Sequence, residues 1–294
     1  MTDFDTAAQG RLELGLAGGG ALRWAAVDLT DVVREARDRR DLGPVSTAAL
    51  GRCMAGAALL LRLSTKTPTR LVLEVRGDGP LRHVLAESDD EGNLRGMVGE
   101  ARVDVPHRPD GKLNVGGAVG KGFLRVLREH GTGGSYNSQV ELVTGEIGDD
   151  LAHYLEQSEQ TSSAVLLGVL AKPDGVAAAG GMIVEVLPNA SDEAISALQA
   201  NIARIKGVSH LLEEGGIPNV LETVLSGLGR DLKEVRPLRY RCRCSRERLL
   251  RHLILLSAED RDYLREGDGA IDADCVFCGE HYRFTQEELQ SPLP

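Results

Sequence analysis

Four cysteines near the end of the sequence constrain this chain more than any other feature. Cys242 and Cys244 are separated by one residue, and Cys275 and Cys278, much further along, by two. Cysteines at i and i+2 of an extended chain point to one face, and a tight turn does the same for i and i+3. Four sulfurs match the tetrahedral ligand set of Zn²⁺, each at about 2.3 Å. The pattern predicts one Zn²⁺ per chain, held by these four side chains.

The sequence also predicts the cellular compartment of the protein. Residues 1–5 have neither the cationic region nor the apolar run of a signal peptide. The most apolar windows, 55–61 and 164–171, are too short to span a bilayer. We expect a cytoplasmic protein without membrane association, in which clustered thiols indicate metal or redox chemistry. Cys53 is alone in a predicted helix and is expected to be a small buried core residue.

Charge and length limit the function further. A net charge of −10 argues against general nucleic-acid binding, which needs basic surface to displace counterions. The 294 residues allow about two domains. Aromatic residues are only 3% of the chain, so its core must consist mainly of Leu, Val, Ile and Ala.

Residues 1–190 alternate strand and helix patterns and are expected to form an N-terminal domain of mixed sheet and helices. Ser46 is predicted to cap a helix that runs to Leu63. Residues 69–76 alternate as a strand, and the turn Gly77-Asp78-Gly79-Pro80 precedes a returning strand at 81–86. Further strands are expected at 123–127, 139–143, 164–170 and 182–187, and further helices at 29–40 and 149–160. The fold class is therefore α+β, with one sizeable sheet.

A glycine-rich stretch in this domain, Gly116-Gly117-Ala118-Val119-Gly120-Lys121-Gly122, is similar to a phosphate-binding loop. It lacks the first glycine of that motif and has no Ser or Thr after the lysine to bind Mg²⁺. Turns and close strand packing are the better interpretation. Nucleotide binding is not expected.

Residues 191–235 are expected to form a helical linker. Ser191 is predicted to cap a helix that ends by Gly207, and Pro218 suits the first turn of a second helix. Gly215-Gly216 joins the two. Short amphipathic helices are marginal alone, so we expect them to dock on the first domain.

Residues 236–294 are expected to form a small C-terminal zinc-binding domain. Ser245 is predicted to cap a helix through Ile254, and strands are expected at 270–274 and 281–284 on either side of the second cysteine pair. Two capping boxes are expected, Ser257 with Asp260 for a helix at 258–266 and Thr285 with Glu288 for a final turn. So small a domain has little apolar core. Structural zinc contributes about 10–16 kcal/mol in small zinc peptides, so the metal should supply most of the folding free energy of this domain.

The densest basic segment of the chain surrounds the first cysteine pair. Cations near a thiol lower its pKa and favour the thiolate that binds metal and reacts with oxidants. A solvated basic helix face and a nucleic-acid patch are the alternatives. The seven arginines, against the single acid Glu247, are Arg236, Arg239, Arg241, Arg243, Arg246, Arg248 and Arg251.

Oxidation would affect such a domain according to how its cysteines pair. Local disulfides within each pair close loops of three and four residues and recover only about 1.6–1.9 kcal/mol each, whereas a long-range disulfide recovers about 4 kcal/mol. Local pairing would therefore remove the metal that joins the two cysteine segments and so unfold the domain. Three connectivities remain open, although each cysteine of the first pair always has its neighbour within reach.

The chain resembles the heat shock protein 33 family of redox-regulated holdase chaperones, and the likeness runs through nearly its whole length. Tyr240 stands where many members have Phe, which we expect to be harmless. The cysteine motif is the most specific part of the likeness, and the earlier stretches mainly indicate the fold. The residues that carry it include Cys242-Arg243-Cys244-Ser245-Arg246-Glu247-Arg248, Cys275-Val276-Phe277-Cys278, Tyr282, Phe284, Gly77-Asp78-Gly79-Pro80-Leu81, Ser158-Glu159-Gln160 and Ala179-Gly180-Gly181.

This resemblance implies a mechanism. The reduced protein would hold one Zn²⁺ through the four cysteines and be inactive. Oxidants would form the disulfides Cys242–Cys244 and Cys275–Cys278, release zinc and unfold the domain. The linker would then loosen and expose apolar surface that binds unfolding client proteins without ATP and prevents their aggregation. The resemblance also implies a homodimer in the oxidised state.

Other functions fit the sequence less well. A zinc-ribbon-like module could bind nucleic acid through the arginine-rich segment, but zinc ribbons usually carry two Cys-x-x-Cys pairs. A thiol oxidoreductase using Cys275 and Cys278 would need a helix after the pair, where Gly279 and a strand pattern follow instead. Hydrolase motifs are missing, so we expect no enzyme and no catalytic residues. His281 could replace a ligand only if one cysteine were free.

Overall fold

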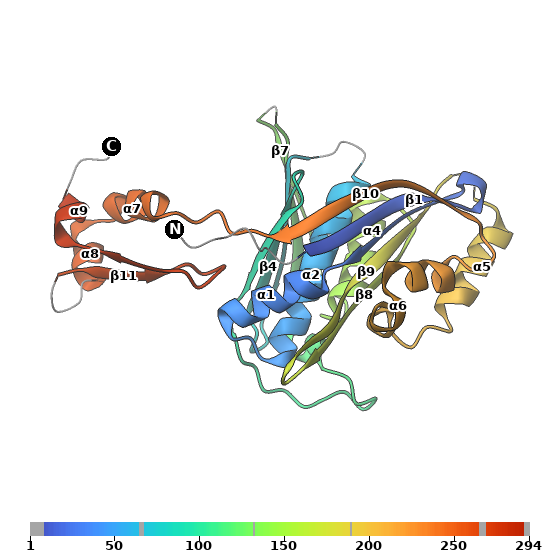
Figure 1. Ribbon diagram of the computed structural model, residues 1–294, viewed down its shortest axis with the longest axis horizontal. Helices are drawn as coiled ribbons and strands as arrows, with labels where there is room; N and C mark the ends of the chain where they lie inside the picture. Colours follow the sequence, from blue (N-terminus) through green and yellow to red (C-terminus); the bar gives the residue numbers. More distant parts are fainter. Residues whose placement is uncertain (1–8, 65–67, 132, 189, 265–268, 291–294) are drawn as a thin grey trace. The chain divides into compact units, whose positions relative to one another are not determined.

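The computed structural model describes residues 9–64, 68–131, 133–188, 190–264 and 269–290 (Figure 1). The chain divides into two compact units, Met1–Arg241 and Cys242–Pro294, which we call unit 1 and unit 2 and describe separately. The signal-peptide expectation for residues 1–5 and the end of the helix expected at 258–266 lie outside the described residues.

Unit 1 is built on one ten-stranded sheet with the order β7-β6-β3-β4-β5-β10-β1-β2-β9-β8. Neighbouring strands are antiparallel except β5 and β10, which are parallel. The fold is therefore α+β, as predicted. The strands are β1 (Gln9–Ala17), β2 (Leu22–Asp28), β3 (Arg70–Gly77), β4 (His83–Asp89), β5 (Asn93–Val98), β6 (Gly122–Glu129), β7 (Ser135–Glu141), β8 (Ser163–Lys172), β9 (Gly175–Val186) and β10 (Arg230–Tyr240).

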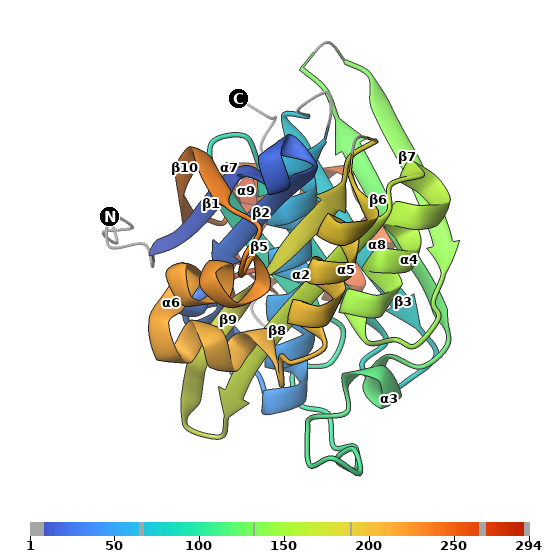
Figure 2. The same cartoon turned by 90° about the vertical axis from the view of Figure 1, so that its right-hand side faces the viewer.

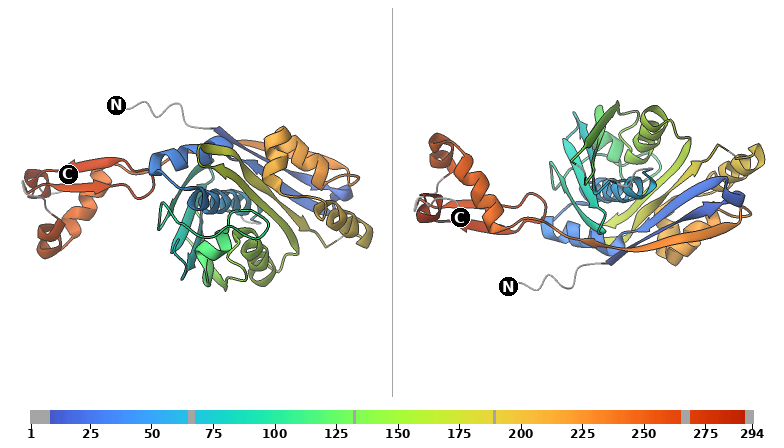
Figure 3. Two further views of the ribbon diagram at one scale, coloured as in Figure 1. Left: turned by 90° about the horizontal axis from the view of Figure 1, so that it is seen from below. Right: turned by 90° about the horizontal axis from the view of Figure 1, so that it is seen from above.

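Helix α2 (Pro44–Leu63) lies inside the curve of this sheet (Figure 3). Its small residues allow close approach, since a Cβ on Gly56 would lie 3.0 Å from a methyl of Leu73. The helix is 20 residues long, longer than the apolar window seen in the sequence, and is apolar enough to cross a membrane. However, 89% of its most apolar window is buried in unit 1, which is typical of the core helix of a soluble protein.

The predicted start of this helix was wrong. The helix begins at Pro44, because proline at the first position has its φ already set and no N–H to leave unpaired. Ser46 is buried, and its hydroxyl donates to the Glu100 carbonyl at 2.9 Å. The other helices on this part of unit 1 are α1 (Thr30–Arg40), the short α3 (Val115–Val119) and α4 (Ile147–Glu159), with a 3₁₀ turn at Gly18–Gly20.

Helices α5 (Asp192–Ile202) and α6 (Val208–Val224) cover the other face of the sheet over β2, β8 and β9 (Figure 2). Ser191 caps α5 as predicted, accepting from the Ala194 amide. Gly207 precedes α6 rather than ending α5, and α6 bends where Gly215 and Gly216 leave helical geometry. The sequence therefore missed a helical segment before the bend. It begins at Val208, which packs with the sheet.

The apolar contact between these helices and the sheet, here called the linker–sheet interface, buries Trp24, the only tryptophan of the chain. Each fully buried aliphatic side chain contributes about 1.5–3 kcal/mol. The helices are thus docked on unit 1. The buried residues of the interface are Ala17, Leu22, Trp24, Ala26, Ala178, Met182 and Val184 from the sheet side, and Leu198, Val208, Leu212, Ile217, Val220, Leu221, Val224 and Leu225 from the helices and the residue after them.

Strand β10 crosses the boundary predicted between residues 235 and 236. It pairs with β1 along its length, and with β5 only at Arg239 and Tyr240. Residues 230–235 are thus extended rather than helical, because β1 offers them a ladder of backbone hydrogen bonds. Tyr240 is buried, with the Arg39 guanidinium 5.6 Å from its ring centroid, and unit 2 begins at Cys242.

The glycine-rich stretch serves close packing. A Cβ on Gly122 would lie 1.9 Å from the Arg76 carbonyl oxygen, and one on Gly116 would lie 2.6 Å from that of Thr144. Gly120 has φ of 76°, which favours glycine. These contacts support the interpretation as turns and close strand packing.

Unit 2 contains α7 (Arg246–Leu255), α8 (Ala258–Leu264), the antiparallel strands β11 (Ile271–Asp274) and β12 (His281–Phe284), and α9 (Gln286–Gln290). The caps are as predicted: Ser245 accepts from the Arg248 amide, Ser257 from Asp260, and Thr285 from Glu288. In the described part of unit 2 the buried apolar cluster is small. Its members are Leu253, Ile271, Phe284 and Leu289.

One ion-pair network on the sheet gives unit 1 a testable acid sensitivity. Burial alone would raise the pKa of Glu87, but hydrogen bonds from Arg95 and Arg70 outweigh it and lower the pKa from 4.5 to about 2. Stability from this group is present above pH 4.5 and lost as pH falls through 2. We expect Glu87→Gln to cost about 2 kcal/mol at pH 7, allowing for solvent screening at Arg70.

That cost should shrink as pH falls from 4.5 toward 2 and approach zero only below pH 2, where Glu87 becomes protonated and both proteins carry a neutral side chain. Urea unfolding followed by Trp24 fluorescence measures it. Glu156→Gln, at an exposed position on α4, is the matched control. A cost for Glu87→Gln that is independent of pH would contradict the electrostatic origin.

Candidate metal centre

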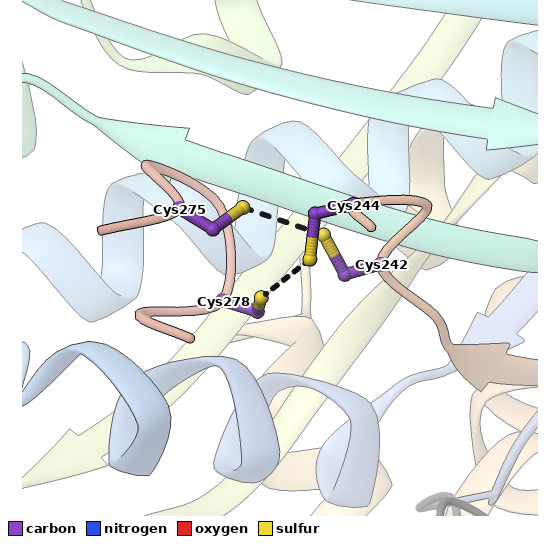
Figure 4. A group of neighbouring side chains, drawn as sticks. All are labelled: Cys242, Cys244, Cys275 and Cys278. Atoms are coloured by element: carbon purple, nitrogen blue, oxygen red, sulfur yellow. Dashed lines mark hydrogen bonds between the residues drawn. The ribbon is translucent and has the colours of Figure 1, made fainter. Parts of the chain in front are cut away.

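Two separate segments bring the four cysteines together in unit 2 (Figure 4). Cys242 and Cys244 lie in the extended chain before α7, and Cys275 and Cys278 in the turn between β11 and β12. The turn is closed by the Gly279 amide, which donates to the Cys275 carbonyl at 2.8 Å. Gly279 has φ of 73°, a backbone conformation that glycine adopts readily. All four thiols point toward one another.

The sulfur positions fit one tetrahedral metal ion. The four Sγ atoms lie within 4.8 Å of one another, and the distances Cys242–Cys275 and Cys244–Cys278 are 3.6 and 3.4 Å. Four sulfurs at about 2.3 Å from a central ion would be about 3.8 Å apart. Cys275 and Cys278 are buried, and Cys242 and Cys244 are partly buried. The cluster could therefore hold a metal ion, and its all-sulfur donor set is consistent with zinc.

The pKa values of three of the thiols are shifted by their neighbours. The pKa of Cys275 is lowered by hydrogen bonds from Cys242 and Cys278, helped by the backbone amides of Cys278 and Phe277. The pKa of Cys242 is raised to about 11 by its bond to Cys275, and that of Cys278 is raised chiefly by its bond to Cys242. A metal that binds all four as thiolates must displace the remaining protons, so its affinity falls with falling pH.

Three of the seven arginines near the first cysteine pair have contacts away from the thiols. Arg236 and Arg239 belong to β10 in unit 1. Arg246 donates to Glu288 at 2.7 Å and lies 4.7 Å from the ring centroid of Phe284, which it covers. The causes of the cysteine pKa shifts are the other thiols, burial and backbone amides. Arg246 therefore stabilises the packing of unit 2.

His281 lies near the cluster but faces two acids. Its ring nitrogens are 2.8 Å from a carboxylate oxygen of Asp274 and 3.1 Å from one of Asp272. The hydrogen bond with Asp274 raises the pKa of His281. It is thus not among the residues brought together at the site.

Cys53 is separate from the site and lies in α2, with its side chain in the core as predicted. Its thiol donates to the Leu73 carbonyl at 3.4 Å, and burial raises its pKa far above the ordinary value. A buried, protonated thiol reacts slowly with oxidants.

Sequence reasoning missed one contact of the site. The Tyr282 hydroxyl, from β12, donates to Cys244 Sγ at 3.2 Å. Tyr282 and Phe284 stack with ring centroids 6.3 Å apart. The available signal was their alternation on a strand directly after the second cysteine pair.

Comparison with known proteins agrees with this architecture. The family model of the Hsp33 protein matches residues 11–285. A 33 kDa chaperonin of Thermus thermophilus is 48% identical, with 96% of this chain and 86% of that protein covered. That of Symbiobacterium thermophilum is 46% identical, with 93% of each covered. The crystal structure of the 33 kDa chaperonin (heat shock protein 33 homolog) of Thermotoga maritima has a TM-score of 0.88 at 34% identity and 97% coverage of both chains.

The fold, the cysteine cluster and these relatives together define the class of the protein as a chaperone. The likeness covers unit 1 and the cysteine cluster alike. The chain belongs to the Hsp33 family.

Proposed function

We propose that the protein is an ATP-independent holdase chaperone switched on by oxidation, and that it catalyses no reaction. The convergence of four thiols from two segments of a unit with a small apolar cluster carries this proposal. In the reduced state Cys242, Cys244, Cys275 and Cys278 hold one Zn²⁺. The metal supplies the crosslink that the small core lacks.

The proposed oxidation uses peroxide as the oxidant. A thiolate sulfur attacks one peroxide oxygen, the O–O bond breaks and hydroxide leaves, giving a sulfenic acid. A second thiolate attacks that sulfur and releases a second hydroxide, so two thiolates lose two electrons and one peroxide is reduced. The pairs Cys242–Cys244 and Cys275–Cys278 are proposed as the products. Both disulfides are local, and neither joins the two segments, so zinc leaves and unit 2 unfolds.

The linker–sheet interface is the apolar surface available for client binding. Helices α5 and α6 and strand β10 connect it in sequence to Cys242. Loosening of these helices would uncover Trp24 and its neighbours on the sheet and the apolar face of the helices themselves. Unfolding clients bind such a surface by burial of apolar side chains. We further propose that the protein is cytoplasmic, dimerises when oxidised, and binds neither nucleic acid nor membranes.

The test combines metal, thiols and activity. Zinc-loaded reduced protein is treated with peroxide at mildly raised temperature, and zinc, free thiols and suppression of client aggregation are measured together. We expect one zinc and four thiols to be lost as suppression appears. Cys53 serves as an internal control, since its thiol should be detected only after denaturation. Equal suppression by protein kept reduced with zinc would exclude the redox switch.

A further inference from the structure

A side chain other than the four cysteines also reaches the cluster. The Tyr282 hydroxyl, from strand β12, donates to Cys244 Sγ at 3.2 Å. Strand β12 follows the second cysteine pair, and Cys244 belongs to the first, so this bond connects the two cysteine segments.

The position of that hydroxyl is fixed by its surroundings. Tyr282 lies opposite Ala273 in the β11–β12 pair, which sets the direction of its side chain. Its ring stacks on Phe284, which is fully buried in the small apolar cluster of unit 2. The ring packing holds the hydroxyl at the sulfur independently of the hydrogen bond itself.

We propose that Tyr282 is a positioning residue of the metal centre that stabilises the Cys244 thiolate and restrains its reaction with oxidants. This inference rests on the proposed zinc-bound reduced state. An O–H donor draws electron density from a thiolate, which favours the charged, metal-binding form. The same withdrawal makes the sulfur lone pair a weaker nucleophile toward peroxide. Tyr282 would therefore set how readily the centre opens.

Removing only the hydroxyl isolates this role. Tyr282→Phe keeps the ring and its packing on Phe284. The matched control is Tyr263→Phe, which removes a hydroxyl from a highly exposed ring, 89% accessible, in the same unit. Loss of a partner that hydrogen-bonds a metal ligand weakens metal binding about 10- to 100-fold. We expect about tenfold weaker zinc binding in chelator competition for Tyr282→Phe, and no change for Tyr263→Phe.

Two further measurements separate the hydrogen bond from a general loss of structure. With Co²⁺ in place of zinc, the sulfur-to-metal charge-transfer band should move to longer wavelength in Tyr282→Phe, because the unbonded thiolate gives up electron density more easily. Zinc release by peroxide should be several-fold faster in the same variant. Both are measured on the full chain.

The outcomes are distinct. In one outcome, wild-type protein binds zinc and loses it to peroxide, and Tyr282→Phe equals Tyr263→Phe in zinc affinity, cobalt band position and zinc release rate. This outcome would overturn the role of Tyr282 and leave the proposed function intact. Wild-type protein that binds no metal would overturn both. Weaker binding of Tyr282→Phe with an unchanged cobalt band would assign the loss to packing and so overturn the role as well.

Discussion

Removal of the metal under reducing conditions is expected to unfold unit 2 while unit 1 stays folded. The buried apolar cluster found in unit 2 has four members, together worth about 6–12 kcal/mol before any conformational entropy is subtracted. Structural zinc contributes about 10–16 kcal/mol in small domains. On the proposed function, a bound zinc ion would therefore be the largest single contribution, and the apolar cluster of the described residues would not order this length of chain alone. Amide hydrogen exchange should show loss of protection in β11 and β12 and little change in β3 and β4.

A pair of cysteine variants sharpens this experiment. Cys278→Ser removes a proposed ligand and should leave unit 2 unprotected even with zinc present. Cys53→Ser makes the same chemical change in the core of unit 1, so any destabilisation should appear there and leave β11 and β12 protected. Preserved protection of β11 and β12 in metal-free, reduced protein would show that apolar packing suffices, and the proposed switch would then have no physical basis.

An acid placed in the linker–sheet interface is expected to produce a chaperone that needs no oxidation. Val224 is fully buried between α6 and the sheet. Burying an unpaired carboxylate there costs several kcal/mol and also removes one buried apolar side chain, so Val224→Asp should weaken the docking of α6 and raise the fraction of molecules in which it leaves the sheet. Reduced, zinc-loaded variant protein should then suppress aggregation of a denatured client at a level near that of oxidised wild-type protein.

Trp24 reports directly on this change. It is fully buried in the linker–sheet interface, and its indole N–H donates to the Leu16 carbonyl at 3.1 Å. Its fluorescence should shift to longer wavelength in Val224→Asp, as water reaches the ring. Ser226→Asp adds the same charge at an exposed position nearby and should change neither fluorescence nor activity. A red shift without gain of chaperone activity would place the client surface elsewhere.

Short-range patterns in the sequence predicted much of this molecule. The alternation of Leu71, Leu73 and Val75 identified β3, and all three are buried. Ser191 and Ser245 were recognised as helix caps from the residues that follow them. The cysteine cluster could be predicted because four soft ligands in close pairs have few other uses in a reducing compartment.

Long-range pairing explains what was missed. The residues of β10, Arg230–Tyr240, are largely charged and include Pro237, so their sequence is typical of a connecting segment. They are extended because β1, at the opposite end of the chain, pairs with them. Tyr282 was noted only as part of the family likeness, since no local pattern reveals which of the four sulfurs its hydroxyl would reach. Both features depend on residues that the chain brings together only when folded.

Strand β10 also decides how unit 1 is held together. It lies between two halves of the sheet and joins them: β7-β6-β3-β4-β5 on one side and β1-β2-β9-β8 on the other. Two residue pairs join β10 to β5, and the last backbone hydrogen bond between them runs from the Arg241 amide to the Leu94 carbonyl, directly before Cys242. Fraying that begins at Cys242 therefore reaches the shortest strand pairing of the sheet, that of β10 with β5, first. If that pairing opened, the two halves would still be joined through helix α2, which contacts strands of both.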